Sequence, residues 1–220
     1  MNRLKISRHV VSFIVLSVAF FGELAAGDYN PLKYTTGTYH TCNPTGTGGD
    51  SYLNTLKNRD IPPDHYSTFT ISDIIALPGL PGAARDHWSD ADRTKAMEYE
   101  SQGATVEGYI VGVRHEGPEA CNCGASSGLR DYHLWLAPNA TDPPGSAVVV
   151  EISPRLLDAH PGWDSKSLGK LKRQKVKVRI SGWLLWDEKH GTSDSRATSW
   201  EVHPIHKIET RRSGDWIDFK

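Results

Sequence analysis

The amino-acid sequence predicts a mainly β fold, and three observations carry that prediction. From residue 104 onwards, hydrophobic and polar residues alternate in five separate runs, the period of a half-buried strand. Turn-forming Pro, Gly and polar residues separate the runs. One helix-like stretch lies between the third and fourth runs. This order is that of an OB-like fold, a small Greek-key barrel; a split sandwich with a capping helix is the alternative.

The composition fits a globular domain and excludes two classes of protein. The chain has 220 residues with seven Trp, eight Tyr and five Phe, which is enough aromatic material for a packed core. It has a single long apolar run, so it is not a polytopic membrane protein. The net charge of −1 disfavours a basic protein that wraps nucleic acid.

The first 27 residues have the three parts of a secretory signal peptide. Arg3, Lys5 and Arg8 are basic, residues 10–21 are apolar, and residues 25–27 are small. We therefore predict cleavage after Gly27 and an exported protein, periplasmic or secreted, that is not an integral membrane protein. An uncleaved anchor is the alternative, although residues 10–21 fall short of the roughly 20 residues that a membrane span needs.

Residues 28–103 predict an irregular, partly helical N-terminal extension. The glycine-rich residues 45–50 read as a loop, and no Gly-Lys-Ser/Thr follows them as in a phosphate-binding loop. Residues 52–59 and 89–102 predict helices, the second with Ser89 as its N-cap. Residues 67–77 fit either a strand or the start of a helix capped by Ser72 or Asp73.

Residues 104–210 predict the barrel domain, and the charged residues 211–220 predict a loose tail. A short helix is expected at residues 165–174. The five predicted strands cover residues 104–115, 131–137, 147–153, 175–187 and 199–209.

Alternation assigns each strand residue to one of two faces of the barrel wall. The apolar face, which we expect to fill the barrel, includes Leu134, Leu136, Val148, Val150, Ile152, Val178, Ile180, Leu184 and Val202. The outer face collects Asp131, His133, Trp135, Glu151, Lys177, Arg179, Trp183, Glu201 and His203. This outer face is either solvated or a binding surface.

As a binding surface, the outer face suits an oligomeric ligand. OB-folds bind oligonucleotides and oligosaccharides across their second and third strands. On that analogy, Trp135 and Trp183 would stack on bases or sugars, and Lys177 and Arg179 would hold phosphate.

The same face carries four residues of metal-ligand type. Asp131 and His133 are two apart on one strand, and Glu201 and His203 are two apart on another. If the strands meet, these side chains suit Zn²⁺ or Mn²⁺, and a metal-bound water would attack a phosphodiester or ester. His203 and His206 point to opposite faces and are not expected to share an ion.

Three cysteines, Cys42, Cys121 and Cys123, would lie in an oxidising compartment after export. The odd number leaves one thiol over. A bridge from Cys42 to either Cys121 or Cys123 is favoured over a strained bridge between the last two. Zinc on the two later cysteines with His115 and His133 is disfavoured, since C-x-C departs from the usual C-x2-C spacing.

The chain resembles a group of uncharacterised exported bacterial proteins with an OB-like domain. The segments that carry the resemblance are LKNR at 56–59, VEGYIV at 106–111, CNC at 121–123, DYHLWL at 131–136, VEISPR at 150–155, HPGW at 160–163, SGWLLWD at 181–187 and WEVHPI at 200–205. The resemblance implies export and an OB-like domain, and it transfers no catalytic residue.

Three functional hypotheses follow from the sequence. The first is an exported binding module, without a cofactor, for a nucleic-acid strand, a glycan or an envelope partner. The second is a metal-dependent hydrolase of nuclease or phosphodiesterase type, with a divalent metal such as zinc. The third is a structural or partner-binding envelope protein.

Overall fold

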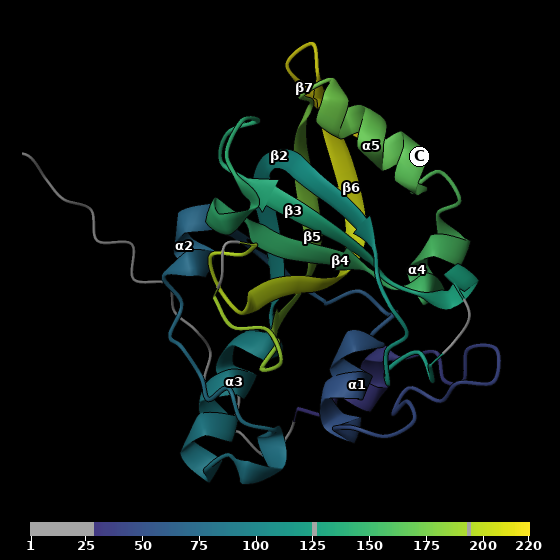
Figure 1. Ribbon diagram of the computed structural model, residues 1–220, viewed down its shortest axis with the longest axis vertical. Helices are drawn as coiled ribbons and strands as arrows, with labels where there is room; N and C mark the ends of the chain where they lie inside the picture. Colours follow the sequence, from purple (N-terminus) through teal and green to yellow (C-terminus); the bar gives the residue numbers. More distant parts are fainter. Residues whose placement is uncertain (1–28, 125–126, 193–194) are drawn as a thin grey trace, which may run out of the picture.

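Five strands close into a barrel in the computed structural model, which describes residues 29–124, 127–192 and 195–220 (Figure 1). The strands are β2 (Gly103–His115), β3 (Tyr132–Ala137), β4 (Val148–Ile152), β5 (Lys177–Trp186) and β6 (Trp200–Arg212). They pair in the order β2-β3-β4-β6-β5, and β5 returns to β2. The β4–β6 pair is parallel and the other barrel pairs are antiparallel. The predicted OB-like barrel is confirmed.

Two further strands extend the sheet. The strand β1 (Tyr66–Phe69) pairs in parallel with the start of β2, and β7 (Asp215–Asp218) pairs with the end of β6. The turn before β7 uses Ser213 and Gly214, both with positive φ, as a tight hairpin requires. The prediction of a loose tail is therefore wrong at β7, because charged residues also suit an edge strand.

The predicted helices form, and their caps explain where they begin. The helix α1 (Ser51–Lys57) starts at Asp50, α3 (Asp90–Glu100) at Ser89, and α5 (Ser165–Arg173) at Asp164. The ambiguous segment 67–77 contains both expected elements, since β1 is followed by α2 (Ile71–Ile75). The cap of α2 is Thr70, not Ser72 or Asp73, and Asp73 completes its capping box. The remaining helices are α4 (Pro154–Ala159) and the 3-10 turns Pro31–Tyr34, Arg85–His87, Ser127–Leu129 and Pro144–Ser146.

The inner face of the barrel is the main core, as the alternation predicts. The side chains Leu134, Val150 and Ile180 are fully buried there and pack in one cluster with Trp186 and Trp200. In Figure 1, α5 lies at one end of the barrel, and α1 and α3 lie at the other. In the described parts of the chain, no helix combines the length and apolar character needed to cross a membrane. The signal peptide predicted for residues 1–27 lies outside the described residues.

The outer face of the barrel is covered where the N-terminal extension lies on it. Leu53 and Leu56 of α1 form a second hydrophobic cluster with Leu185 of β5. Trp183 is 1% exposed beneath Tyr29 and Tyr34. The expectation of a solvated outer face is therefore wrong for this part of the wall.

Arg59 fixes the extension to the barrel. Its side chain is fully buried and its guanidinium lies 4.5 Å from the centre of the Trp183 ring. The guanidinium donates hydrogen bonds to the main-chain carbonyls of Glu100 at the end of α3, Leu184 of β5 and His203 of β6. One side chain thus satisfies acceptors from three segments that are distant in sequence.

We expect Arg59→Met to destabilise the protein by about 3 kcal/mol or more, because several charge-assisted hydrogen bonds are lost in a buried place. Urea unfolding followed by far-ultraviolet circular dichroism measures this loss. Arg173→Met, at an exposed position at the end of α5, is the matched control and should change stability little. Equal stabilities of the two variants would contradict the role given to Arg59.

We expect the buried imidazole of His206 to make the stability of the protein depend on pH. Burial lowers the pKa of His206 to about 4, and its Nε2 lies 3.1 Å from the Arg59 carbonyl oxygen. In the unfolded chain the His206 imidazole takes up a proton near pH 6.5, whereas in the folded protein it stays neutral at that pH. Acid therefore favours unfolding. Stability should fall by up to about 3 kcal/mol between pH 6.5 and pH 4 from this group alone. In His206→Gln, urea unfolding at both pH values should show a smaller loss, whereas the exposed control His87→Gln should behave as the native protein does.

Candidate metal centre

Three neighbouring strands bring imidazoles and carboxylates together on the outer face of the barrel. His133 of β3 lies directly opposite Glu151 of β4. The parallel register pairs Val149 and Val150 of β4 with Glu201 and Val202 of β6, which places His203 next to Glu151. Alternation turns these side chains to the same side of the wall. Asp131 precedes β3 and joins them, so strand pairing assembles the group.

Glu151 is the centre of this cluster. One of its carboxylate oxygens contacts Nε2 of His133, and the other lies 3.1 Å from Nδ1 of His203. His203 Nε2 lies 3.8 Å from Asp131 Oδ2, and its Nδ1 lies 3.7 Å from Glu201 Oε2. All five residues are between 0 and 1% exposed. We call Asp131, His133, Glu151, Glu201 and His203 the central cluster.

Many polar atoms of the central cluster have no hydrogen-bond partner among the described residues. They are Asp131 Oδ2, Glu201 Oε2, and both side-chain nitrogens or oxygens of His133, Glu151 and His203. Oxygens of Glu151 lie at ion-pair distances from nitrogens of His133 and His203. Buried polar atoms are rarely left in this way, and those here are all of metal-ligating type.

The surrounding cations neutralise only part of the negative charge. Arg196 pairs with Glu201. Lys57 of α1 lies 3.1 Å from Asp187 and 3.2 Å from Glu119. Within the described residues, ion pairs join Asp131 and Glu151 only to histidines. The central cluster therefore has an excess of negative charge whenever its histidines are neutral.

The pKa values show how strongly the cluster members interact without a metal. Burial lowers the pKa of His203, but the carboxylates, Glu151 above all, outweigh burial and raise it to about 10. The pKa of His133 is raised in the same way, again mainly by Glu151. Burial raises the pKa of Glu151, but the two imidazoles overcome this and hold it well below its usual range. Burial raises the pKa of Asp131 to about 7.

Among the described residues, four sets of three ligand-type residues lie in and around the central cluster. Within each set, one ligand atom of every residue lies within 4.8 Å of the others. The set with all three residues buried is Asp131, Glu151 and His203. The other sets are Glu116–Glu119–His133, Glu119–Cys121–Asp131 and Asp187–His190–Glu201. Glu119 and Asp131 are shared residues that link three of the sets. The fourth set shares no residue with them, but it contains Glu201 of the central cluster.

Of the four residues predicted from sequence as metal ligands, Asp131 and Glu201 lie near His203, and His133 joins them through Glu151. Alternation places Glu151 on the same face but indicates no role for it. Glu116, Glu119 and His190 were missed because they lie in loops, where alternation assigns no face. Asp187 ends the predicted strand 175–187 and directly follows β5, but it was given no role. The signal available for Glu151 was its place as the charged residue of an otherwise hydrophobic strand, in Val-Val-Val-Glu-Ile.

The four residues predicted to bind an oligomeric ligand do not form a surface. Trp183 is buried under the N-terminal extension, and Trp135 is 8% exposed, packed with Val149 and covered by Arg114. Lys177 pairs with Glu107, and Arg179 pairs with Glu209. The stacking role predicted for the two tryptophans is therefore wrong. Alternation assigned the face on which they lie, but it did not show which residues cover that face.

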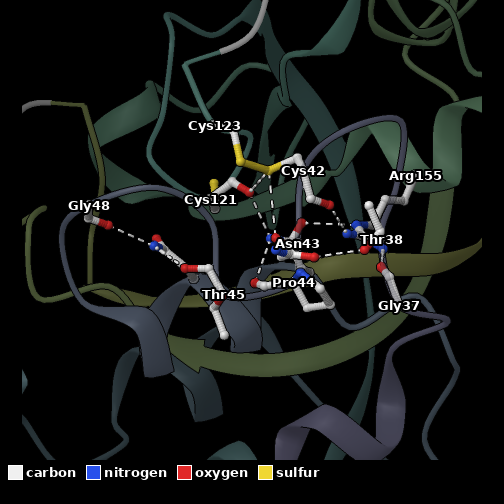
Figure 2. Close-up of a disulfide and its surroundings, with 12 residues drawn as sticks. Gly37, Thr38, Cys42, Asn43, Pro44, Thr45, Gly48, Cys121, Cys123 and Arg155 are labelled. Carbon is white, nitrogen blue, oxygen red and sulfur yellow. Dashed lines mark hydrogen bonds between the residues drawn. A yellow bond between two sulfur atoms is a disulfide. The ribbon is translucent and has the colours of Figure 1, made fainter.

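The cysteines pair as Cys42–Cys123, one of the two favoured alternatives, and Cys121 remains a buried free thiol (Figure 2). The bridge ties the N-terminal extension to the loop between β2 and β3. Asn58 Nδ2 donates to the carbonyls of Pro44 and Cys121, and Arg155 donates to the carbonyls of Gly37 and Cys42. The alternative zinc set is not assembled, since Cys123 is in the disulfide and His115 stacks on Tyr132.

Similarity to known proteins indicates no function for this chain, so the functional proposal rests on the geometry of the site. No protein-family model matches the chain, and no curated protein matches it.

Proposed function

We propose that this protein is an exported metal-binding protein. Its barrel holds a divalent transition metal with Asp131, Glu151 and His203, next to His133 and Glu201. The observation that carries the proposal is the group of buried, unpartnered nitrogen and oxygen atoms that face one another in the central cluster. A cation among these atoms would satisfy them and would replace the protons that the imidazoles release on binding it.

The donor types favour a particular class of metal. Imidazole suits zinc and other late first-row ions, whereas all-oxygen sites suit magnesium and calcium. The set Asp131–Glu151–His203 mixes one imidazole with two carboxylates. Zn²⁺ or Mn²⁺ matches this mixture best, and the second imidazole, of His133, favours zinc.

Burial supports metal binding over metal-dependent hydrolysis. A catalytic metal site keeps an open position for water and substrate. The residues of the central cluster are at most 1% exposed. A cavity of about 670 Å³ is lined by Tyr52, Trp88 and Met97, and its lining includes none of the central cluster. A phosphodiester that reached this cavity would still be separated from the central cluster.

The proposed location outside the cytoplasm has two supports. The pattern of residues 1–27 predicts a signal peptide, and Cys42 and Cys123 form a disulfide. Disulfides persist mainly in exported proteins. The binding of an oligomeric ligand finds less support, because Trp135 and Trp183 are buried.

We expect protein purified from the exported fraction, without a chelator or a His-tag, to contain at least about one transition-metal ion per chain by mass spectrometry. Chelation should lower its melting temperature, because a metal bound only to the folded state stabilises that state. The variant Glu151→Gln keeps the size of the side chain but loses its charge, and it should lose most of the metal.

Glu107→Gln is the matched control, since Glu107 is a partly exposed carboxylate that pairs with Lys177 and lies outside the central cluster. It should retain the metal content of the native protein. Native protein without metal, and without a rise in melting temperature when Zn²⁺ is added, would overturn the proposal. Circular dichroism of each variant confirms that it is folded.

A further inference from the structure

The free thiol of Cys121 marks a second metal position beside the first. We propose that Cys121, Glu119 and Asp131 bind a second, thiophilic divalent ion, and that Asp131 is shared between the two ions. This inference rests on the proposed function, because Asp131 belongs to both ligand sets. It adds a ligand of a different chemical class, a thiolate, to a centre otherwise made of imidazoles and carboxylates.

The geometry supports a separate position rather than a larger first site. One ligand atom from each of Glu119, Cys121 and Asp131 lies within 4.8 Å of the others, and Sγ of Cys121 is 3.4 Å from Glu119 Oε2. The set Asp131–Glu151–His203 meets the same criterion, and the two sets have only Asp131 in common. Carboxylates commonly bridge pairs of metal ions at distances of about 3.5–4 Å.

Asp131 is held in an orientation that suits a bridging ligand. Asn122 donates to its Oδ1 at 3.1 Å, which fixes the carboxylate. Its Oδ2 is buried, lacks a hydrogen-bond partner among the described residues, and lies 3.8 Å from His203 Nε2. An unpartnered, fully buried carboxylate oxygen is thus available on the carboxylate that both sets share.

The surroundings of Cys121 are those of a ligand rather than of a core residue. Buried free cysteines usually pack as small apolar side chains. Cys121 is 3% exposed and belongs to none of the hydrophobic clusters of the described residues. Its charged neighbours are Glu119, Asp131 and Lys57. The Lys57 ammonium contacts Glu119, but it also has Asp187 as a carboxylate partner at 3.1 Å.

A thiolate determines the class of metal that the second position accepts. Thiolates select zinc, copper(I) and chemically similar ions over magnesium, calcium and manganese. On binding, the S–H bond of Cys121 breaks, its proton goes to solvent, and a metal–sulfur bond forms. No oxidant or reductant takes part, and the Cys42–Cys123 disulfide stays intact. We therefore assign the second position to Zn²⁺, with Co²⁺ as a spectroscopic probe.

The test replaces the bound metal with Co²⁺ in the full exported chain, kept free of reductant so that Cys42 and Cys123 remain bonded. We expect a near-ultraviolet thiolate-to-cobalt charge-transfer band in the native protein. In Cys121→Ser this band should disappear and the bound cobalt should fall by about one equivalent, with the first position still filled. In Glu151→Gln the band should persist while the first position is lost. Glu107→Gln should match the native protein in both readouts.

The outcomes separate this inference from the proposed function. Bound cobalt without a charge-transfer band in the native protein, and unchanged in Cys121→Ser, would overturn the second position and leave the first. No bound cobalt in the native protein would overturn both. The band in the native protein is a readout that does not depend on whether Cys121→Ser folds.

Discussion

Charge buried on the outer wall of the barrel is the constraint on which the rest of the structure depends. Glu151 and Glu201 are fully buried, and Asp131 is 1% exposed. Moving a carboxylate out of water costs several kcal/mol unless cations and hydrogen bonds replace its hydration. The inner face of the barrel cannot supply them, because it is apolar. Every group that compensates these charges must come from the wall itself or from the segments that cover it.

Those segments are held in place by three different kinds of contact. Arg59 donates to carbonyls of β5 and β6, including that of His203 in the central cluster. The Cys42–Cys123 bridge joins positions 81 residues apart, which is worth about 4 kcal/mol in the loop-entropy description. Lys57 of α1 brings its ammonium directly to Asp187. The N-terminal extension therefore also supplies positive charge to two carboxylates that border the central cluster, Glu119 and Asp187.

The sequence predicts the barrel well because a two-residue period is a strong signal. All five barrel strands, the helix at residues 165–173 and the inner face follow from alternation and caps. Alternation also places His133, Glu151, Glu201 and His203 on one face. It does not show what covers that face, so Trp135 and Trp183 were interpreted as exposed when packing had buried them. Strand β7 and the loop residues Glu116, Glu119 and His190 lack any periodic signal.

The pairing of the three cysteines depends on the backbone around Cys123, which spacing does not reveal. Spacing alone leaves Cys121 and Cys123 equally able to reach Cys42. The backbone at Cys123 and Gly124 has φ of 55° and 65°, so the chain turns in the left-handed region there. This turn faces Cys123 toward Cys42, while Cys121 lies beside Glu119 and within ligand distance of Asp131. The bridge thus leaves Cys121, which borders the central cluster, as a free thiol.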